Sequence, residues 1–321
     1  MKLPKSETMK PTAVIDMSVL EEICREPSLE IRENAWNYLV GRYQLVFPLI
    51  LVEEAVSKWL KASGEPPSHL KELIGIVSRS WKLWLDDIHN ITARELLEGH
   101  LPRSLPPASL EVVSTVLALE RGTQDACLWL QNRKDEAKSL EVARRQSKQQ
   151  AQQHLPKDQC EKLNEVALFS DVLVPFVHWL TSNPANGKRG VENMLVSLLR
   201  RRFPILGQQF DVAVDTFLSP RWMQFQLAAC LLQARVAYLA APLLVLQQPR
   251  FGKPGPFLEI HRNDRADEKY VTAAFLCQRL LTQDLGMARI MAAFEDGGFW
   301  KGKTVFLPKG QWLHEPNKHC V

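Results

Sequence analysis

Residues 12–18 read Thr-Ala-Val-Ile-Asp-Met-Ser, a short apolar run rich in β-branched residues that ends in Asp16. Such a run, preceded by a polar leader at residues 1–11, is typical of a buried strand. Ser18, with Glu21 three positions later, fits a capping box and predicts that a helix follows at once. The stretch therefore predicts an acidic side chain where a buried strand meets a helix.

The same alternation continues toward residue 63. Residues 29–40 are amphipathic and predict a helix, residues 43–47 predict a second strand, and Pro48 opens a helix that runs to about Ala62. A strand–helix–strand–helix order is typical of an α/β domain with a mostly parallel sheet.

Similar patterns return near the carboxyl end of the chain. We expect strands at 256–261, 280–282 and 303–307, and helices at 266–280 and 286–294. Neither end is large enough to bury a sheet on both faces by itself. We therefore expect one α/β domain with a first part at 12–63 and a second part at 251–310, interrupted by an all-helical insertion at 64–250.

The predicted insertion contains one long apolar stretch, residues 227–246. It is long enough to cross a bilayer. However, Gln233 and Arg235 lie at its centre and Pro242 interrupts it. A central arginine is costly in a membrane, so the stretch predicts a buried helix and no membrane association.

Composition narrows the class of protein. The 321 residues are 45% hydrophobic and 24% charged, with a formal net charge of +4, as in an ordinary globular protein. With 15 glycines the chain has no glycine-rich phosphate loop, which excludes Walker-type and dinucleotide-binding sites. Its 6 cysteines are scattered without a CxxC pair, and no apolar signal segment opens the sequence, so we expect a cytoplasmic protein with reduced thiols.

Acidic residues recur where the predicted strands end. Asp16 and Asp284 each follow a strand, Glu54 lies on the helix after the second strand, and Asp267 opens the helix before strand 280–282. The carboxyl ends of parallel strands share one edge of a sheet, where ligands bind. Carboxylates gathered there favour Mg²⁺ or Mn²⁺ and suit phosphodiester hydrolysis. The alternative is that Asp16 and Asp284 are helix N-caps and that the glutamates are surface charges.

Four segments, in this order, resemble the acidic motifs of PIN-domain nucleases. They are the apolar strand ending in Asp16 with Ser18 two positions on, the segment Pro48 to Glu54, the alanine-rich helix opened by Asp267, and Thr282-Gln283-Asp284.

This resemblance implies a Rossmann-like α/β/α sandwich and a Mg²⁺- or Mn²⁺-dependent nuclease, usually acting on RNA. It implies that the metal-binding acids are Asp16, Glu54, Asp267 and Asp284, and that the hydroxyls of Ser18 and Thr282 orient carboxylates or a metal-bound water. The spacing leaves Glu53 as an alternative to Glu54, and Asp264 or Glu268 as alternatives to Asp267. Because toxin–antitoxin nucleases belong to this family, a protein inhibitor or partner and a homodimer also fit the resemblance.

The densest basic cluster is Arg200, Arg201 and Arg202. It predicts contact with a nucleic-acid backbone, or else solvated charge at the end of a helix. A second hypothesis for the whole chain is a catalytically inactive PIN-like scaffold that binds RNA or protein through the helical block.

Overall fold

The computed structural model describes the two ends of the chain and short pieces of its middle. The described residues are 10–61, 67–109, 113–114, 128, 131–132, 226–228, 230–231, 234, 245–246, 255–256, 264–296 and 300–319. Most of the predicted insertion, including the basic cluster at 200–202, lies outside them.

A five-stranded sheet in the order β3-β2-β1-β6-β7 forms the centre of the described structure, and all of its strand pairs are parallel. Its strands are β1 (Thr12–Ile15), β2 (Gln44–Pro48), β3 (Trp84–Leu85), β6 (Arg279–Thr282) and β7 (Lys303–Phe306). The two ends of the chain therefore build one sheet, which confirms the predicted α/β class. A separate antiparallel pair joins β4 (Val245–Leu246) to β5 (Gly255–Pro256).

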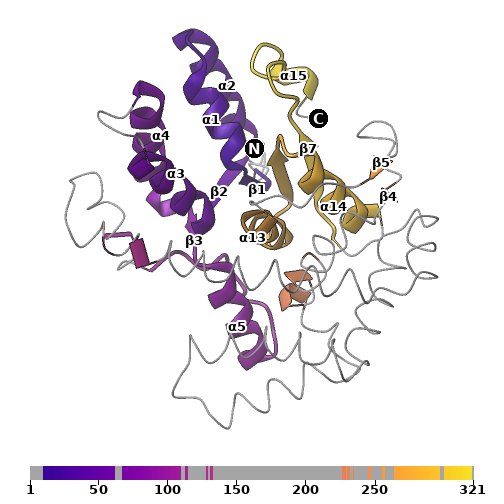
Figure 1. Cartoon of the computed structure of the whole chain (residues 1–321). Coiled ribbons are helices and arrows are strands. Elements are labelled where there is room, and N and C mark those ends of the chain that lie inside the picture. The colour runs from indigo at the N-terminus through magenta and orange to yellow at the C-terminus, as the bar shows by residue number, and fades with distance from the viewer. Residues whose placement is uncertain are drawn as a thin grey trace, which may run out of the picture.

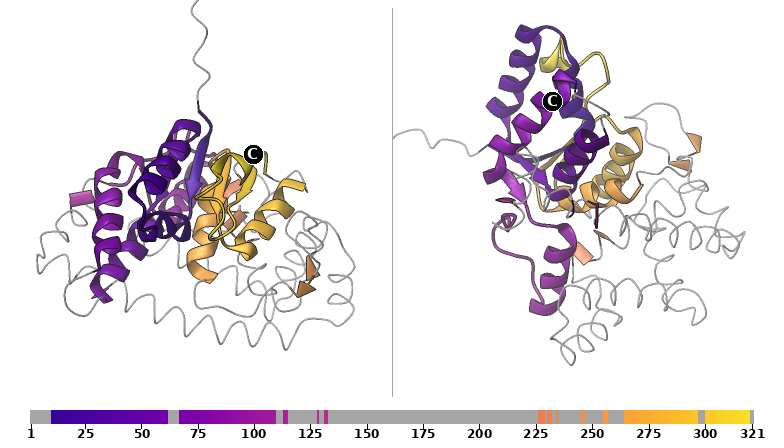
Figure 2. Two further views of the ribbon diagram at one scale, coloured as in Figure 1. Left: turned by 90° about the horizontal axis from the view of Figure 1, so that it is seen from above. Right: turned by 60° about the vertical axis from the view of Figure 1, so that its left-hand side comes forward.

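Helices lie around this sheet (Figure 1). The described helices are α1 (Met17–Arg25), α2 (Leu29–Arg42), α3 (Leu49–Lys61), α4 (Ser68–Arg79), α5 (Ile88–Glu98), α13 (Asp264–Phe275), α14 (Leu285–Asp296) and α15 (Pro316–His319). Helix α13 packs against β1, β2 and β6, and α14 packs against β6 and β7. Two views show α5 extending away from the body that contains α1 to α4 (Figures 1 and 2).

The central strand β1 owes its position to its apolar sequence. Ala13, Val14 and Ile15 are fully buried, because strands from both ends of the chain flank β1 and helices cover it. Helix α1 begins at Met17, and its N-cap is Asp16 rather than the predicted Ser18. The Asp16 carboxylate accepts a hydrogen bond from the backbone N–H of Ser18, which moves the cap two residues earlier.

The sheet continues beyond residue 63, where the helical insertion was expected to begin. Strand β3 pairs with β2 at Phe47↔Trp84 and Pro48↔Leu85, so α4 and β3 lie within the α/β domain. The sequence pattern does not predict β3, because two residues are too few to show the alternation of a strand and the residues on either side follow a helical period. The backbone of Ala108 donates to the Trp84 carbonyl (3.0 Å), so a later segment of the chain covers this edge strand.

Helix α13 is shorter than the predicted helix 266–280. It ends at Phe275, and tighter backbone bonds from Leu276 to Ala273 and from Cys277 to Ala274 close its last turn. The chain then joins β1, because the Gln278 N–H donates to the Thr12 carbonyl (3.0 Å).

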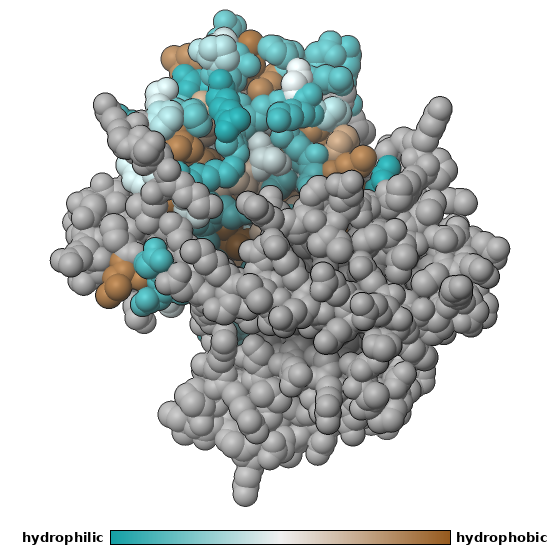
Figure 3. Space-filling view, in the orientation of Figure 1, coloured by the Kyte–Doolittle hydropathy of each residue, from teal (hydrophilic) through white to brown (hydrophobic). Residues whose placement is uncertain are grey.

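Part of the apolar stretch 227–246 is visible against the core. Leu227, Ala228 and Leu231 are fully buried, and the Glu95 carboxylate of α5 accepts from the N–H groups of Leu227 (3.0 Å) and Ala228 (2.8 Å). In the part of the chain that the structure describes, no helix has the length and apolar character needed to cross a membrane. The described residues on the face shown in Figure 3 mix hydrophilic and apolar side chains.

Candidate active site

The strand order reverses direction between β1 and β6. From β1 the chain proceeds to β2 and β3 on one side, and from β6 it proceeds to β7 on the other. Ligands of open parallel sheets bind at the carboxyl ends of the strands at such a switch point. Ile15 pairs with Leu281, and the Asp16 N–H donates to the Leu281 carbonyl (3.0 Å). This pairing holds Asp16 beside Thr282, although 266 residues separate them.

Two hydroxyl groups hold the Asp16 carboxylate. Oδ2 accepts from Ser18 Oγ at 2.5 Å and from Thr282 Oγ1 at 2.9 Å. Asp16 is only 6% exposed, and burial raises its pKa. The two hydroxyls oppose this shift, while the negative charge of Asp284 adds to it, so Asp284 acts on Asp16 through space.

Asp284 is exposed and connects to the same hydroxyl. Its backbone N–H donates to Thr282 Oγ1 (2.9 Å), and its Oδ1 accepts from the Met287 N–H (2.8 Å) at the start of α14. Asp284 therefore caps α14, as the alternative interpretation of the sequence held, and still lies beside the Asp16 site. Thr282 connects the two residues, since its hydroxyl donates to the Asp16 carboxylate and accepts from the Asp284 backbone N–H.

Glu54 faces the same region from α3. Its Oε2 accepts from the hydroxyl of Tyr270 on α13 (2.8 Å). Burial raises the pKa of Glu54 to about 7, Asp16 contributes to the rise, and the Tyr270 hydrogen bond opposes it. The buried Asp16 carboxylate thus acts on the half-buried Glu54 through its charge.

Glu53, the alternative to Glu54, faces a different group. The ammonium of Lys269 on α13 lies 3.9 Å from Glu53 Oε2 and 3.4 Å from Asp87 Oδ2. The structure therefore places Glu53 in an ion cluster and Glu54 with Asp16 and Tyr270.

Asp267 lies half-buried near the start of α13. The Tyr270 hydroxyl is fully buried, and its pKa is raised well above the ordinary value by burial and then by the charges of Glu54, Asp16 and Asp267. Asp267 thus acts on the hydroxyl that holds Glu54. Of the two alternatives to Asp267, Glu268 is buried and the side chain of Asp264 lies outside the described residues.

Asp16 and the Asp284 backbone share the Thr282 hydroxyl, and Glu54 accepts from the Tyr270 hydroxyl, on which the charge of Asp267 acts. Among the described side chains, no group of three or more histidine, cysteine, aspartate or glutamate residues is close enough to hold one metal ion.

Three residues of this edge escaped the sequence analysis: Tyr270, Lys269 and Asp87. Asp87 had a usable signal, because Asp86-Asp87 directly follows β3 as Asp16 follows β1. Tyr270 and Lys269 had no such signal, because both lie inside a helix and acquire their partners only where α13 packs against α3. Asp86 itself is held by Asn90 (3.2 Å) and Arg94 (3.3 Å).

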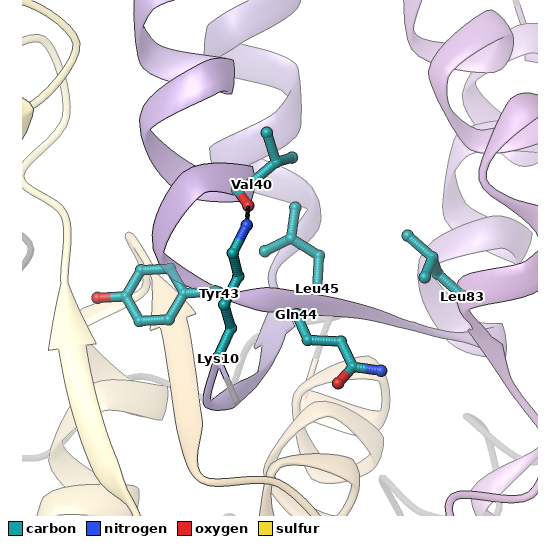
Figure 4. Close-up of a pocket in the computed structure, with 6 residues that line it drawn as sticks. All are labelled: Lys10, Val40, Tyr43, Gln44, Leu45 and Leu83. Atoms are coloured by element: carbon teal, nitrogen blue, oxygen red, sulfur yellow. Dashed lines mark hydrogen bonds between the residues drawn. The ribbon is translucent and has the colours of Figure 1, made fainter. Parts of the chain in front are cut away.

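A separate pocket lies where β2 begins, at the opposite edge of the sheet from the acids (Figure 4). It is lined by Lys10, Val40, Tyr43, Gln44, Leu45 and Leu83. The Lys10 ammonium donates to the Val40 carbonyl (2.7 Å), so this lysine completes the last turn of α2.

Comparison of the chain with protein-family models, curated protein sequences and solved structures gave no significant match. We call the carboxyl ends of the strands, with Asp16, Asp284 and Glu54, the acidic edge. The fold and the acidic edge therefore define the class of protein by themselves: an α/β protein with a parallel sheet and carboxylates at its topological switch point.

Proposed function

We propose that the protein is a metal-dependent nuclease of PIN-like architecture that hydrolyses phosphodiester bonds, with RNA as the favoured substrate. The observation that carries the proposal is that Asp16 and Asp284, from opposite ends of the chain, both hydrogen-bond to the Thr282 hydroxyl at the switch point between β1 and β6. The order of acidic motifs in the sequence supports it independently.

The donor chemistry fits a hard divalent cation. Burial raises the pKa values of Asp16 and Glu54; the charge of Asp284 adds to the rise at Asp16, and the charge of Asp16 adds to the rise at Glu54. A cation between such groups relieves their repulsion, and carboxylate oxygens are the ligands that Mg²⁺ and Mn²⁺ prefer. Asp16, Glu54 and Asp284 would supply carboxylate oxygens to the ion, with Asp267 behind Tyr270 as the fourth acid, and their side chains would have to move closer together to surround it, because no three described acids are close enough as they lie. When bound, the ion supplies an activated water and stabilises the leaving oxygen.

Hydroxyl groups of the chain orient the carboxylates. Ser18 and Thr282 fix the Asp16 carboxylate by donating to one oxygen, and Tyr270 fixes Glu54 in the same way. All three donors are neutral hydroxyls, so they direct the acids without cancelling their charge. The exposed position of Asp284 leaves this edge open to a phosphodiester strand.

Two further parts of the proposal concern the cellular compartment and the contact with nucleic acid. The described cysteines, Cys24, Cys230 and Cys277, are free and buried, which fits a reducing cytoplasm. Arg200, Arg201 and Arg202 stay a predicted backbone contact outside the described residues.

Cleavage of a labelled single-stranded RNA tests the proposal. The wild-type chain should cleave in Mn²⁺ and stop in EDTA, and Asp16→Asn should lose at least about a hundredfold in rate, as expected for removal of a group that stabilises the transition state. Glu33→Gln, an exposed acid on α2, is the matched control and should cleave like the wild type. Cleavage by Asp16→Asn at the wild-type rate would overturn the proposal, and a parallel single-stranded DNA separates the two substrates.

A second candidate is an inactive PIN-like scaffold that binds RNA or protein. The observation that favours it is the use of Asp284 Oδ1 as the cap of α14. On this account Mn²⁺ leaves the melting temperature unchanged, whereas a bound cation raises it by mass action.

A further inference from the structure

Arg289 on α14 is a buried cation without a partner in the described structure. It is 9% exposed, and its Nε is buried and has no hydrogen-bond acceptor among the described atoms. Other buried charges are compensated: the Lys269 ammonium lies 3.4 Å from Asp87 Oδ2, and the Glu95 carboxylate accepts from two backbone N–H groups. A buried charge is costly unless it is paired. An unpaired guanidinium therefore points to a counter-ion from outside the chain.

The position of Arg289 in α14 brings its guanidinium toward the carboxyl end of β6. Helix α14 begins at Leu285, three residues after Thr282, the last residue of β6. Side chains of helical residues lean toward the amino terminus of the helix and lie over the residues three and four positions earlier. For Arg289 these are Gly286, which has no side chain, and Leu285, which is 37% exposed. The guanidinium therefore extends toward the first turn of α14, on a side that solvent reaches.

The first turn of α14 also offers backbone donors. The first N–H groups of a helix have no acceptor within the helix. Asp284 Oδ1 accepts from Met287, but the N–H groups of Leu285 and Gly286 donate to no other described group. Five residues turn about 140° around a helix, so Asp284 and Arg289 lie on different sides of it. The Asp284 carboxylate therefore leaves both the guanidinium and these two N–H groups for another acceptor.

We propose that Arg289 and the first turn of α14 form a binding site for a phosphate group. A guanidinium matches two phosphate oxygens with parallel hydrogen bonds, and a helix amino terminus attracts an anion through its dipole and its free N–H groups. The site lies beside Asp284, so the phosphate is that of a nucleic-acid strand at the acidic edge, and in this respect the inference rests on the proposed function. A free phosphate has the same chemistry, and the site itself needs no metal ion.

Thermal unfolding of the full-length protein in EDTA tests the site, with inorganic phosphate replacing chloride at constant ionic strength. The melting temperature of the wild type should rise with phosphate, because a ligand of the folded state stabilises it by mass action. Arg289→Met removes the unpaired charge and keeps an apolar side chain. It should melt no lower than the wild type without phosphate and gain nothing from phosphate. Arg79→Met, which replaces an exposed arginine in the last turn of α4, is the matched control and should gain as the wild type does.

Fluorescence anisotropy of a labelled single-stranded RNA, also in EDTA, separates the two sources of phosphate. For a strand phosphate, Arg289→Met should bind the RNA about tenfold more weakly, as expected for the loss of a charged hydrogen bond. The slope of log affinity against log salt should become shallower by about 0.7, the value for one phosphate of a single strand. Unchanged RNA affinity, with a phosphate response that only the variant lacks, would assign the site to a free phosphate.

Two results would overturn the site. One is a wild type that does not respond to phosphate, together with unchanged RNA binding by Arg289→Met. The other is a melting temperature of Arg289→Met well below that of the wild type without phosphate, because the charge would then be compensated within the chain. If Arg289→Met does not fold, Arg289→Lys keeps the charge without the paired geometry and should lose most of the response. Since every measurement is made in EDTA, failure here leaves the metal-dependent nuclease in place, and failure of Mn²⁺-dependent cleavage leaves the phosphate site in place.

Discussion

At the acidic edge, neutral hydroxyls and charged groups affect the carboxylates in different ways. Ser18, Thr282 and Tyr270 each donate one hydrogen bond to a carboxylate that faces the switch point. A neutral donor restricts the rotation of a carboxylate but leaves its net charge for a cation. Lys269, by contrast, compensates the acids that it contacts.

Tyr270→Phe removes only the hydroxyl that holds Glu54. A hydrogen bond to a charged group contributes about 1.5–3 kcal/mol, so Mn²⁺ affinity should fall by about tenfold. In a Glu54→Gln background the same change should have little further effect, because the bond to a carboxylate is already gone. Tyr38→Phe on α2 is the control. Equal, additive losses in both backgrounds would show that Tyr270 acts on folding alone.

The raised pKa of Glu54 links folding to pH. Burial moves its pKa from 4.5 to about 7, so the folded state binds a proton more tightly than the unfolded state does. This contribution to stability is complete below about pH 4.5 and is lost as pH rises through about 7, to a total of at most about 3 kcal/mol. Urea unfolding in EDTA should therefore show lower stability at about pH 8 than at about pH 5. Glu54→Gln should reduce this difference, and an unchanged pH dependence in that variant would contradict the assignment.

The residues that could be predicted are those that flank strands. Thr282 ends β6, and Asp16, Ser18 and Asp284 lie within three residues after β1 or β6, so a strand prediction places them at the edge of the sheet. Tyr270 could not be predicted, because its role depends on the rotation of α13 relative to α3, which local sequence does not determine.

At the scale of elements, α1 connects the site to the carboxyl end of the chain. The Glu22 carboxylate accepts from the Gln283 side chain, from the Gly310 N–H and from the indole N–H of Trp312 (2.6 Å). Gly310 has a φ of 75°, which favours glycine at this turn. Trp312 is fully buried, so Glu22 ties the loop before α14 to a packed segment.

Glu22→Ala should lower the free energy of unfolding by about 2–3 kcal/mol, because it leaves a buried indole N–H without its acceptor. Urea denaturation measures this, with Glu33→Ala as the exposed control. A loss as small as that of the control would show that Glu22 contributes little to this connection.

Long apolar patterns made most elements predictable. The predicted bounds of β1 match the observed ones, those of β2 differ by one residue at both ends, and those of β6 and β7 differ by one residue at one end. Strand β3 was missed because two residues have no period of their own. The position of Trp84 depends on pairing with β2 and on the bond from its indole N–H to the Val77 carbonyl (3.1 Å).

At the scale of the whole molecule, β1 has partners from both ends of the chain. Val14 pairs with Val46 on one side and with Leu280 on the other. The sequence predicted this closure because neither end has enough apolar surface for a sheet of its own.

Deleting residues 264–321 should therefore abolish cooperative unfolding, since it removes α13, β6, α14 and β7 and exposes a long apolar edge of β1. Thermal unfolding followed by circular dichroism measures the loss. A shortened chain that still unfolds in one cooperative transition would show that the amino-terminal part is an independent domain.

The central claim is that acids from the two ends of the chain form one cation site. Calorimetric titration of Mn²⁺ into the wild type, Asp16→Asn and Asp284→Asn tests it most directly. We predict binding by the wild type, with a loss of about tenfold or more in affinity for each variant. Absence of binding by the wild type, or undiminished binding by both variants, would contradict the account.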